Sequence, residues 1–269
     1  NGVIAVANIS SDGGAASSGT NAGGVGGAIT ITSGTNNVIT LNGSTLNSAG
    51  GTSGGGTQGA GATINFDDPV ALATGAVAIT SGATAGNIVF DQIVNGSQAL
   101  TMTAGTGNIT LTGIVGGSTP LGLVTVNAAA DVTTSATFKS AGFNQAVTGT
   151  GTTAIGGLLT STAAVTLDAA TIDLNAGITT TGGGADGLVT LNASTLVDLA
   201  TSQAITTTDG TANDNTAAGA VDINVSGTGT VNLVGNIVTT GGTSNASVGG
   251  AGGAVTIDTA NGVIAVANI

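Results

Sequence analysis

The sequence predicts an all-β fold, a parallel β-helix (β-solenoid) with essentially no α-helix. Pairs of apolar residues separated by one other residue recur along the chain, and this alternation is typical of short strands with one buried face. The pairs follow glycine-rich stretches at intervals of about 18 to 34 residues, a spacing typical of solenoid repeats. Glu and Arg are absent and Lys139 is the one basic residue, so most residues with high helix propensity are missing.

Each predicted coil consists of a first apolar pair, a turn, a second apolar pair, a single apolar anchor and a glycine-rich loop. The first pairs are Ile29/Ile31, Ile64/Phe66, Val77/Ile79, Leu100/Met102, Val124/Val126, Val165/Leu167, Val189/Leu191, Val221/Ile223 and Val255/Ile257. The clearest second pairs and anchors are Ile4/Val6 with Ile9, Ile39/Leu41 with Leu46, Ile109/Leu111 with Ile114, Ile172/Leu174 with Ile178, Val197/Leu199 with Ile205, and Val231/Leu233 with Ile237. The coils would start near residues 28, 62, 76, 99, 123, 146, 164, 188, 220 and 254, which gives about ten to eleven coils.

The interior of such a helix is narrow, so we expect Val, Ile, Leu and Ala to fill it and to leave no room for aromatic side chains. Thr, Asn, Asp and Ser are expected on the outside, where Thr combines strand propensity with a hydroxyl that tolerates water. The pattern is irregular at residues 67–69 and 138–143, where we expect bulges or local excursions.

Residues 1–9 recur without change as residues 261–269. This repeat predicts that residues 1–269 are a single continuous β-solenoid and one period, of about 260 residues, of a tandem repeat. The absence of an initiating Met and of a signal peptide adds the expectation of a piece of a longer protein. The repeated segment would be the second pair and anchor of a coil, so that the join between periods falls inside a coil.

Composition excludes several classes of function. The formal net charge is -12, which argues against binding to nucleic acid or to an anionic membrane surface. No apolar run approaches the roughly 18 residues of a membrane span. The chain has neither Cys nor His, which excludes disulfides and the metals that need those ligands.

Long loops of Gly, Ala, Ser, Thr and Asn are expected at one corner of the coils, at residues 11–27, 47–61, 206–219 and 239–253. Insertions at one position of each repeat map to one face of a solenoid, so these loops would form a ridge. Glycine-rich loops are usually flexible, but stacked loops can also pair with one another.

No catalytic residue and no organic cofactor are predicted. An enzyme site of the acid–base type needs carboxylates together with His, Arg or Lys, and Lys139 has no nearby acid in the sequence. Ca²⁺ is the alternative, because Asp209 and Asp214 lie in a Gly/Asn-rich loop and Asp67 and Asp68 are adjacent. The other role for these Asp residues is solvation and protection against edge-to-edge pairing.

Residues 253–269, Gly-Ala-Val-Thr-Ile-Asp-Thr-Ala-Asn-Gly-Val-Ile-Ala-Val-Ala-Asn-Ile, show the pattern in its clearest form. The segment resembles the repeat region of filamentous-haemagglutinin-type adhesins and of giant tandem-repeat bacterial surface proteins. This resemblance, which is one of pattern over nearly the whole chain, implies an exported, right-handed parallel β-helix at a bacterial cell surface.

We therefore expect a non-catalytic structural component of an extracellular fibre, stalk or sheath, in which copies of the chain stack end to end, with lateral packing as a further contact. The alternative is an adhesin whose loop ridge binds a glycan or another cell surface, although no aromatic platform for stacking on sugars is present. Asn-x-Ser/Thr sequons at Asn8, Asn42, Asn95, Asn108, Asn192, Asn224 and Asn245 are candidate glycan acceptors.

Overall fold

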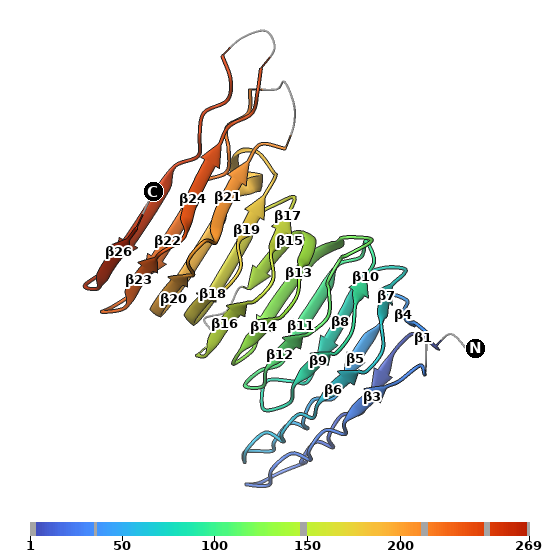
Figure 1. Ribbon diagram of the computed structural model, residues 1–269. Helices are drawn as coiled ribbons and strands as arrows, with labels where there is room; N and C mark the ends of the chain where they lie inside the picture. The colour runs from blue at the N-terminus through green and yellow to red at the C-terminus, as the bar shows by residue number, and fades with distance from the viewer. Residues whose placement is uncertain (1–3, 35–36, 146–149, 211–214, 245–247, 268–269) are drawn as a thin grey trace. The chain divides into compact units, whose positions relative to one another are not determined.

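Short parallel strands make up almost all of the regular structure (Figure 1). The computed structural model describes residues 4–34, 37–145, 150–210, 215–244 and 248–267. Within these ranges the helical structure is a single 3₁₀ turn, η1 (Gly184–Gly187). The predicted all-β class is confirmed, and the parallel sheets are consistent with a β-solenoid. The chain forms two compact units, Asn1–Ser135 (unit 1) and Ala136–Ile269 (unit 2), which are described separately below.

In unit 1 the chain passes in turn through three stacks of parallel strands, and each strand is one rung of its stack. The first stack contains β1 (Ile4–Val6), β4 (Ile39–Leu41), β7 (Val70–Leu72) and β10 (Val94–Asn95). The second contains β2 (Ile9–Ser10), β5 (Thr45–Asn47), β8 (Val77–Thr80), β11 (Leu100–Thr103) and β13 (Leu121–Ala128). The third contains β3 (Ile29–Ile31), β6 (Ile64–Phe66), β9 (Ile88–Phe90), β12 (Ile109–Leu111) and β14 (Val132–Thr134).

Unit 2 has the same organisation, with longer strands that turn a corner and serve two stacks. The first stack contains β16 (Thr152–Ile155), the second halves of β18 (Val165–Leu174) and β20 (Val189–Leu199), β23 (Thr230–Leu233) and β26 (Val263–Val266). The second contains the start of β15 (Phe138–Gln145), β17 (Leu159–Ser161), β19 (Ile178–Thr180), β21 (Ala204–Thr208) and β24 (Asn236–Thr240). The third contains the end of β15, the first halves of β18 and β20, β22 (Val221–Val225) and β25 (Val255–Thr259). In both units the glycine-rich loops join the second stack to the third.

The core consists of aliphatic side chains aligned from rung to rung. Ile172, Val197 and Val231 are direct neighbours in successive rungs, and each is fully buried. Because alternate residues of a strand face opposite sides, the polar residues between them lie outside. Burying each such aliphatic side chain contributes about 1.5–3 kcal/mol, which offsets the entropy lost by ordering a chain with so many glycines.

All four Phe residues lie in the interior, so the expectation that the interior excludes aromatic side chains is wrong. The rings of Phe66 and Phe90 stack with centroids 4.5 Å apart and planes 6° apart, and Phe138 and Phe143 meet edge to face with centroids 5.3 Å apart. Neighbouring rungs are about 4.8 Å apart, which is close to the spacing of stacked rings. Two Phe residues in register can therefore share one stack.

The predicted coil starts near residues 62 and 76 are wrong as separate coils. Strands β6, β7 and β8 lie in the third, first and second stacks, so they form one turn of the chain. The pairs at Ile64 and Val77 therefore belong to the same coil. The pairs at Leu100 and Val124 likewise lie in the second stack with Val77. Alternation identifies a strand but does not say which stack it joins. The predicted start near residue 146 borders residues 146–149, outside the described ranges.

The two stretches where we expected bulges or local excursions are corners of the chain. Residues 67–69 form the turn between β6 and β7, and residues 138–143 lie in β15, which passes from the second stack to the third. Among the described strand pairs, the register shifts between Met102 and Thr103 and between Ala169 and Thr171.

Candidate functional site

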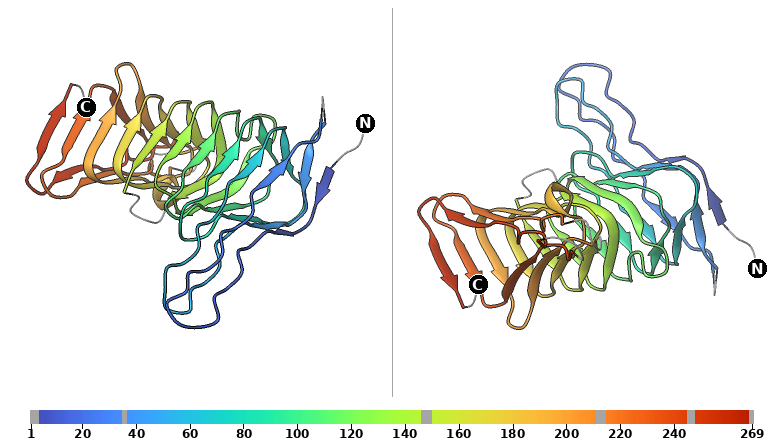
Figure 2. Two further views of the ribbon diagram at one scale, coloured as in Figure 1. Left: turned by 90° about the horizontal axis from the view of Figure 1, so that it is seen from below. Right: turned by 90° about the horizontal axis from the view of Figure 1, so that it is seen from above.

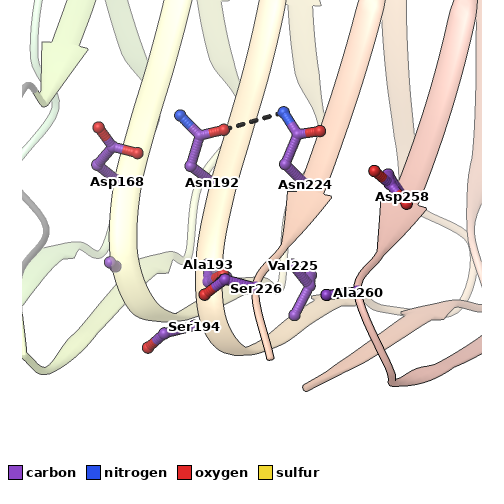
Figure 3. Close-up of a pocket in the computed structure, with 10 residues that line it drawn as sticks. Asp168, Asn192, Ala193, Ser194, Asn224, Val225, Ser226, Asp258 and Ala260 are labelled. Atoms are coloured by element: carbon purple, nitrogen blue, oxygen red, sulfur yellow. Dashed lines mark hydrogen bonds between the residues drawn. The ribbon is translucent and has the colours of Figure 1, made fainter. Parts of the chain in front are cut away.

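A row of Asp and Asn side chains follows the outer face of the third stack in unit 2. Asp168, Asn192, Asn224 and Asp258 are partners in four successive rungs, β18, β20, β22 and β25. Figure 3 shows the four side chains side by side, with the Asn224 amide nitrogen donating a hydrogen bond of 3.1 Å to the Asn192 amide oxygen. They line a pocket of about 500 Å³ together with Ala169, Ala193, Ser194, Val225, Ser226 and Ala260.

The chemistry available to this row is hydrogen bonding and attraction of cations. Asp168 and Asp258 are separated by three rung spacings, or about 14 Å, whereas a pair of carboxylates that cleaves a glycosidic bond lies about 5–9.5 Å apart. The groups between them are amides, which donate and accept hydrogen bonds but do not act as general acids or bases. The geometry of the row therefore gives no acid–base pair.

A second row crosses the first stack of unit 2 and places two carboxylates on neighbouring rungs. Asp173 is the partner of Asp198, and Asp198 is the partner of Asn232. The Asn232 amide donates to Asp198 at 2.6 Å, and the Asn175 amide donates to Asp173 at 2.7 Å. Like charges directly opposite each other destabilise a sheet, and these amide donors counteract that repulsion.

Asp67 and Asp68 accept hydrogen bonds from residues 32–34, which follow strand β3 in the preceding rung. The Asp68 carboxylate accepts the backbone N–H groups of Ser33 at 2.6 Å and Gly34 at 3.1 Å. The Asp67 carboxylate accepts the Thr32 hydroxyl at 2.7 Å and the Asn65 side-chain amide. These two Ca²⁺ candidates thus bind protein donors at a corner of unit 1.

Asp209 lies at the start of the loop between β21 and β22. It lines a shallow hollow with Thr208, Gly210, Thr240, Gly241, Gly242 and Thr243, and its backbone N–H donates to the Thr240 carbonyl at 3.3 Å. Asp214, the other candidate in this loop, lies outside the described residues. In the part of the chain that the structure describes, no three acidic side chains gather around one point.

The long loops of unit 1 pair with each other, which decides between the two alternatives left open by the sequence. Residues 11–27 and 48–61 project together in both views of Figure 2. Backbone N–H groups of the first loop donate to carbonyls of the second, from Ser11 to Asn47, Gly13 to Ala49, Ala16 to Thr52, Gly23 to Thr57 and Gly26 to Ala60, at 2.8–3.1 Å. The loop ridge of this unit is therefore a hydrogen-bonded layer.

Glycine is required in this layer because the backbones approach too closely for a side chain. A Cβ atom on Gly59 would lie 1.9 Å from the Gly24 carbonyl oxygen, and one on Gly51 would lie 2.1 Å from the Gly14 oxygen. A Cβ on Gly14 itself would meet no atom within 4 Å. The glycine content thus reflects close packing of loops as well as flexibility.

A Ser or Thr hydroxyl closes the base of most of the glycine-rich loops, a feature that the sequence reasoning missed. In each case the Ser or Thr is one of the last two residues of the strand before the loop or directly follows that strand, and it donates to a carbonyl at the far end of the loop. The bonds run from Ser48 to Ala62, Ser81 to Gly86, Thr180 to Gly187, Thr207 to Gly219 and Thr239 to Gly253, at 2.5–2.9 Å. The sequence signal is a Ser or Thr close to the end of the strand that precedes most of the glycine-rich segments.

Asn side chains at other corners bind the next turn of the chain. The Asn87 side-chain oxygen accepts the Asn108 backbone N–H at 2.9 Å, and the Asn108 side-chain oxygen accepts the Asp131 backbone N–H at 3.2 Å. Asn8 accepts the Thr45 backbone N–H at 2.8 Å in the same way. Hydrogen bonds between neighbouring rungs thus involve six of the seven sequon residues, Asn8, Asn42, Asn95, Asn108, Asn192 and Asn224. Asn245 lies outside the described residues.

The outermost rungs of unit 2 are strands β25 and β26, and they leave apolar side chains uncovered. Val255 is 36% exposed and Ile264 is 45% exposed, whereas their partners in the preceding rung, Val221 and Val231, are 1% and 0% exposed. Figure 1 shows β26 at the edge of this unit beside β23. The outermost rungs thus carry the same inward-facing residue types as the interior rungs but are packed on one side only.

Lys139, the one basic residue, is exposed on the outer face of β15, where its partner is Thr160. Among the described residues, no helix is both long enough and apolar enough to cross a membrane. No family model, no curated protein and no solved structure matches the chain.

Proposed function

We propose that this protein is a non-catalytic structural component of an extracellular fibre, stalk or sheath, built by stacking copies of the chain end to end. The observation that carries the proposal is the outermost pair of rungs in unit 2. Val255 and Ile264 have the inward-facing pattern of a covered rung, yet no rung of the described chain covers them. A further layer of the same kind would bury both side chains.

The contacts within each unit support a mechanical role. Hydrogen bonds between rungs, the paired loops of unit 1 and the Asn contacts between Asn87, Asn108 and Asp131 all connect one turn of the chain to the next. Tension along such a stack is shared by many parallel hydrogen bonds. The exterior consists of short, mostly uncharged side chains with one basic residue, which offers few sites to trypsin-like proteases.

In finer detail, the proposed solenoid is right-handed, has about ten to eleven coils in each period and continues from one copy to the next. At about 4.8 Å per rung, each copy adds roughly 50 Å to the length of the fibre. The proposed location at a cell surface rests on the resemblance to surface-protein repeats.

Electron microscopy of chains with one, two and three tandem copies tests the proposal. Rods that lengthen by roughly 50 Å with each copy support it. Flexible strings of separate globules would refute it.

A glycan array probed with the same three-copy chain tests the adhesin alternative. The structural proposal predicts no glycan-specific signal. A signal that disappears when residues 11–27 and 48–61 are replaced by short turns would favour an adhesin instead.

A further inference from the structure

One nine-residue sequence occurs in two structural contexts. As residues 261–269 it contributes β26, which pairs with β23 on the side of the preceding rung. As residues 1–9 it contributes β1, which pairs with β4 on the side of the following rung. Each context therefore shows the pairing partner on one of the two edges of the same strand.

The registers of the two contexts are compatible. Ile264 is the partner of Val231, and its counterpart Ile4 is the partner of Ile39. The same holds two residues further on. Val266 is the partner of Leu233, and its counterpart Val6 is the partner of Leu41. Superposing the two copies of the sequence thus gives three successive rungs with aliphatic side chains aligned on the inner face. A shift of one residue would place these side chains on the outer face.

The flanking residues fit the same superposition. With residues 261–269 serving as residues 1–9 of the next copy, the number of residues from Val255 to Ile29 of that copy equals the number from Val221 to Val255. Val221 and Val255 are partners in successive rungs, so this number is one turn of unit 2. The loops before these strands also match, because residues 249–254 and 23–28 both read Gly-Gly-x-Gly-Gly-Ala. Strands β25 and β3 each follow such a loop directly.

We propose that the partner of the outermost rungs of unit 2 is unit 1 of a second copy of this chain, joined through a shared strand. Residues 261–269 of one copy take the place of residues 1–9 of the next, with β23 on one edge and β4 on the other. Strand β25 then pairs with β3 of the second copy, so that Thr256 faces Thr30 and Val255 is covered by Ile29. This inference rests on the proposed end-to-end assembly and specifies its register.

A disulfide between copies tests the register directly. The chain has no native Cys, so two introduced cysteines have only each other as partners. In a tandem chain in which residues 261–269 of the first copy serve as residues 1–9 of the second, the substitutions are Thr256→Cys in the first copy and Thr30→Cys in the second. Both Thr side chains are exposed, so neither substitution disturbs the core. The proposed rungs place the two Cα atoms about 4.8 Å apart, within the range for a disulfide.

The matched control replaces Asp222, the partner of Thr256 in the preceding rung, by Cys in combination with the same Thr30→Cys. That pair would be two rungs apart, at about 10 Å, which is too far for a disulfide. We expect nearly complete cross-linking for Thr256→Cys with Thr30→Cys and almost none for the control. Hydrogen exchange of residues 255–259 should also be at least about tenfold slower in the tandem chain than in the single chain.

The outcomes separate this inference from the proposed function. A rod-like tandem chain without the Thr256–Thr30 cross-link, or with unchanged exchange at residues 255–259, would overturn the shared-strand register and leave the fibre proposal standing. Two separate globules in electron micrographs would overturn both.

Discussion

The hydroxyl bonds at the bases of the loops give the sharpest prediction about stability, and Thr207 is the clearest case. Its side chain is fully buried, and its hydroxyl donates to the Gly219 carbonyl at 2.5 Å across the base of the loop between β21 and β22. Thr207→Val keeps the shape of the side chain and removes the donor. Leaving a buried carbonyl without its hydrogen bond costs about 1–3 kcal/mol, so we expect this loss in the local stability of unit 2.

Hydrogen exchange is the suitable assay because stacked repeats can open locally before they unfold as a whole. A loss of about 1–3 kcal/mol corresponds to roughly 5- to 150-fold faster exchange of the amides in β21 and β22. The matched control is Thr206→Val, which removes a hydroxyl from the neighbouring, outward-facing residue of the same strand. Equal exchange rates in the two variants would refute the proposed role of the Thr207 hydroxyl.

Three further predictions concern the paired loops of unit 1, the stacked rings of Phe66 and Phe90, and the row of Asp173, Asp198 and Asn232. Gly59→Ala should destabilise the paired loops by about 1–3 kcal/mol in chemical denaturation, whereas Gly14→Ala, with open space at its Cβ position, should be nearly neutral; equal effects would contradict the close packing. Phe90→Ala should cost about 3–5 kcal/mol of unfolding free energy, and a loss below about 1 kcal/mol would mean that the ring is not packed in the core. Asn232→Asp should destabilise unit 2 more than Asn232→Ala does, with the difference shrinking at about 1 M salt; a difference that does not depend on salt would exclude charge repulsion from Asp198.

The sequence predicts the strands of this fold well because alternation depends only on neighbouring residues. The inward positions of Ile172 and Leu174, for example, follow directly from the spacing of two apolar residues around one polar residue. The assignment of strands to stacks could not be predicted in the same way. The pairs at Ile64 and Val77 have the same pattern, and only the pairing of β6 with β9 and of β8 with β11 separates them.

The features of the site that escaped sequence reasoning all depend on contacts between turns. The row from Asp168 to Asp258 requires the register of four strands, which loops of different lengths separate in the sequence. The stacking of Phe66 on Phe90 requires that both occupy the same position of successive rungs. Asp67 and Asp68 are adjacent in the sequence, but three of their hydrogen-bond donors lie one turn earlier in the chain, at residues 32–34.

Cryo-electron microscopy of a three-copy tandem chain, with neighbouring copies sharing one nine-residue segment, tests the central claim most directly. The account predicts one uninterrupted rod in which strands about 4.8 Å apart run across the long axis and continue without a gap through both joins. Globular beads connected by segments without β-structure, or strands that run along the rod axis, would contradict it.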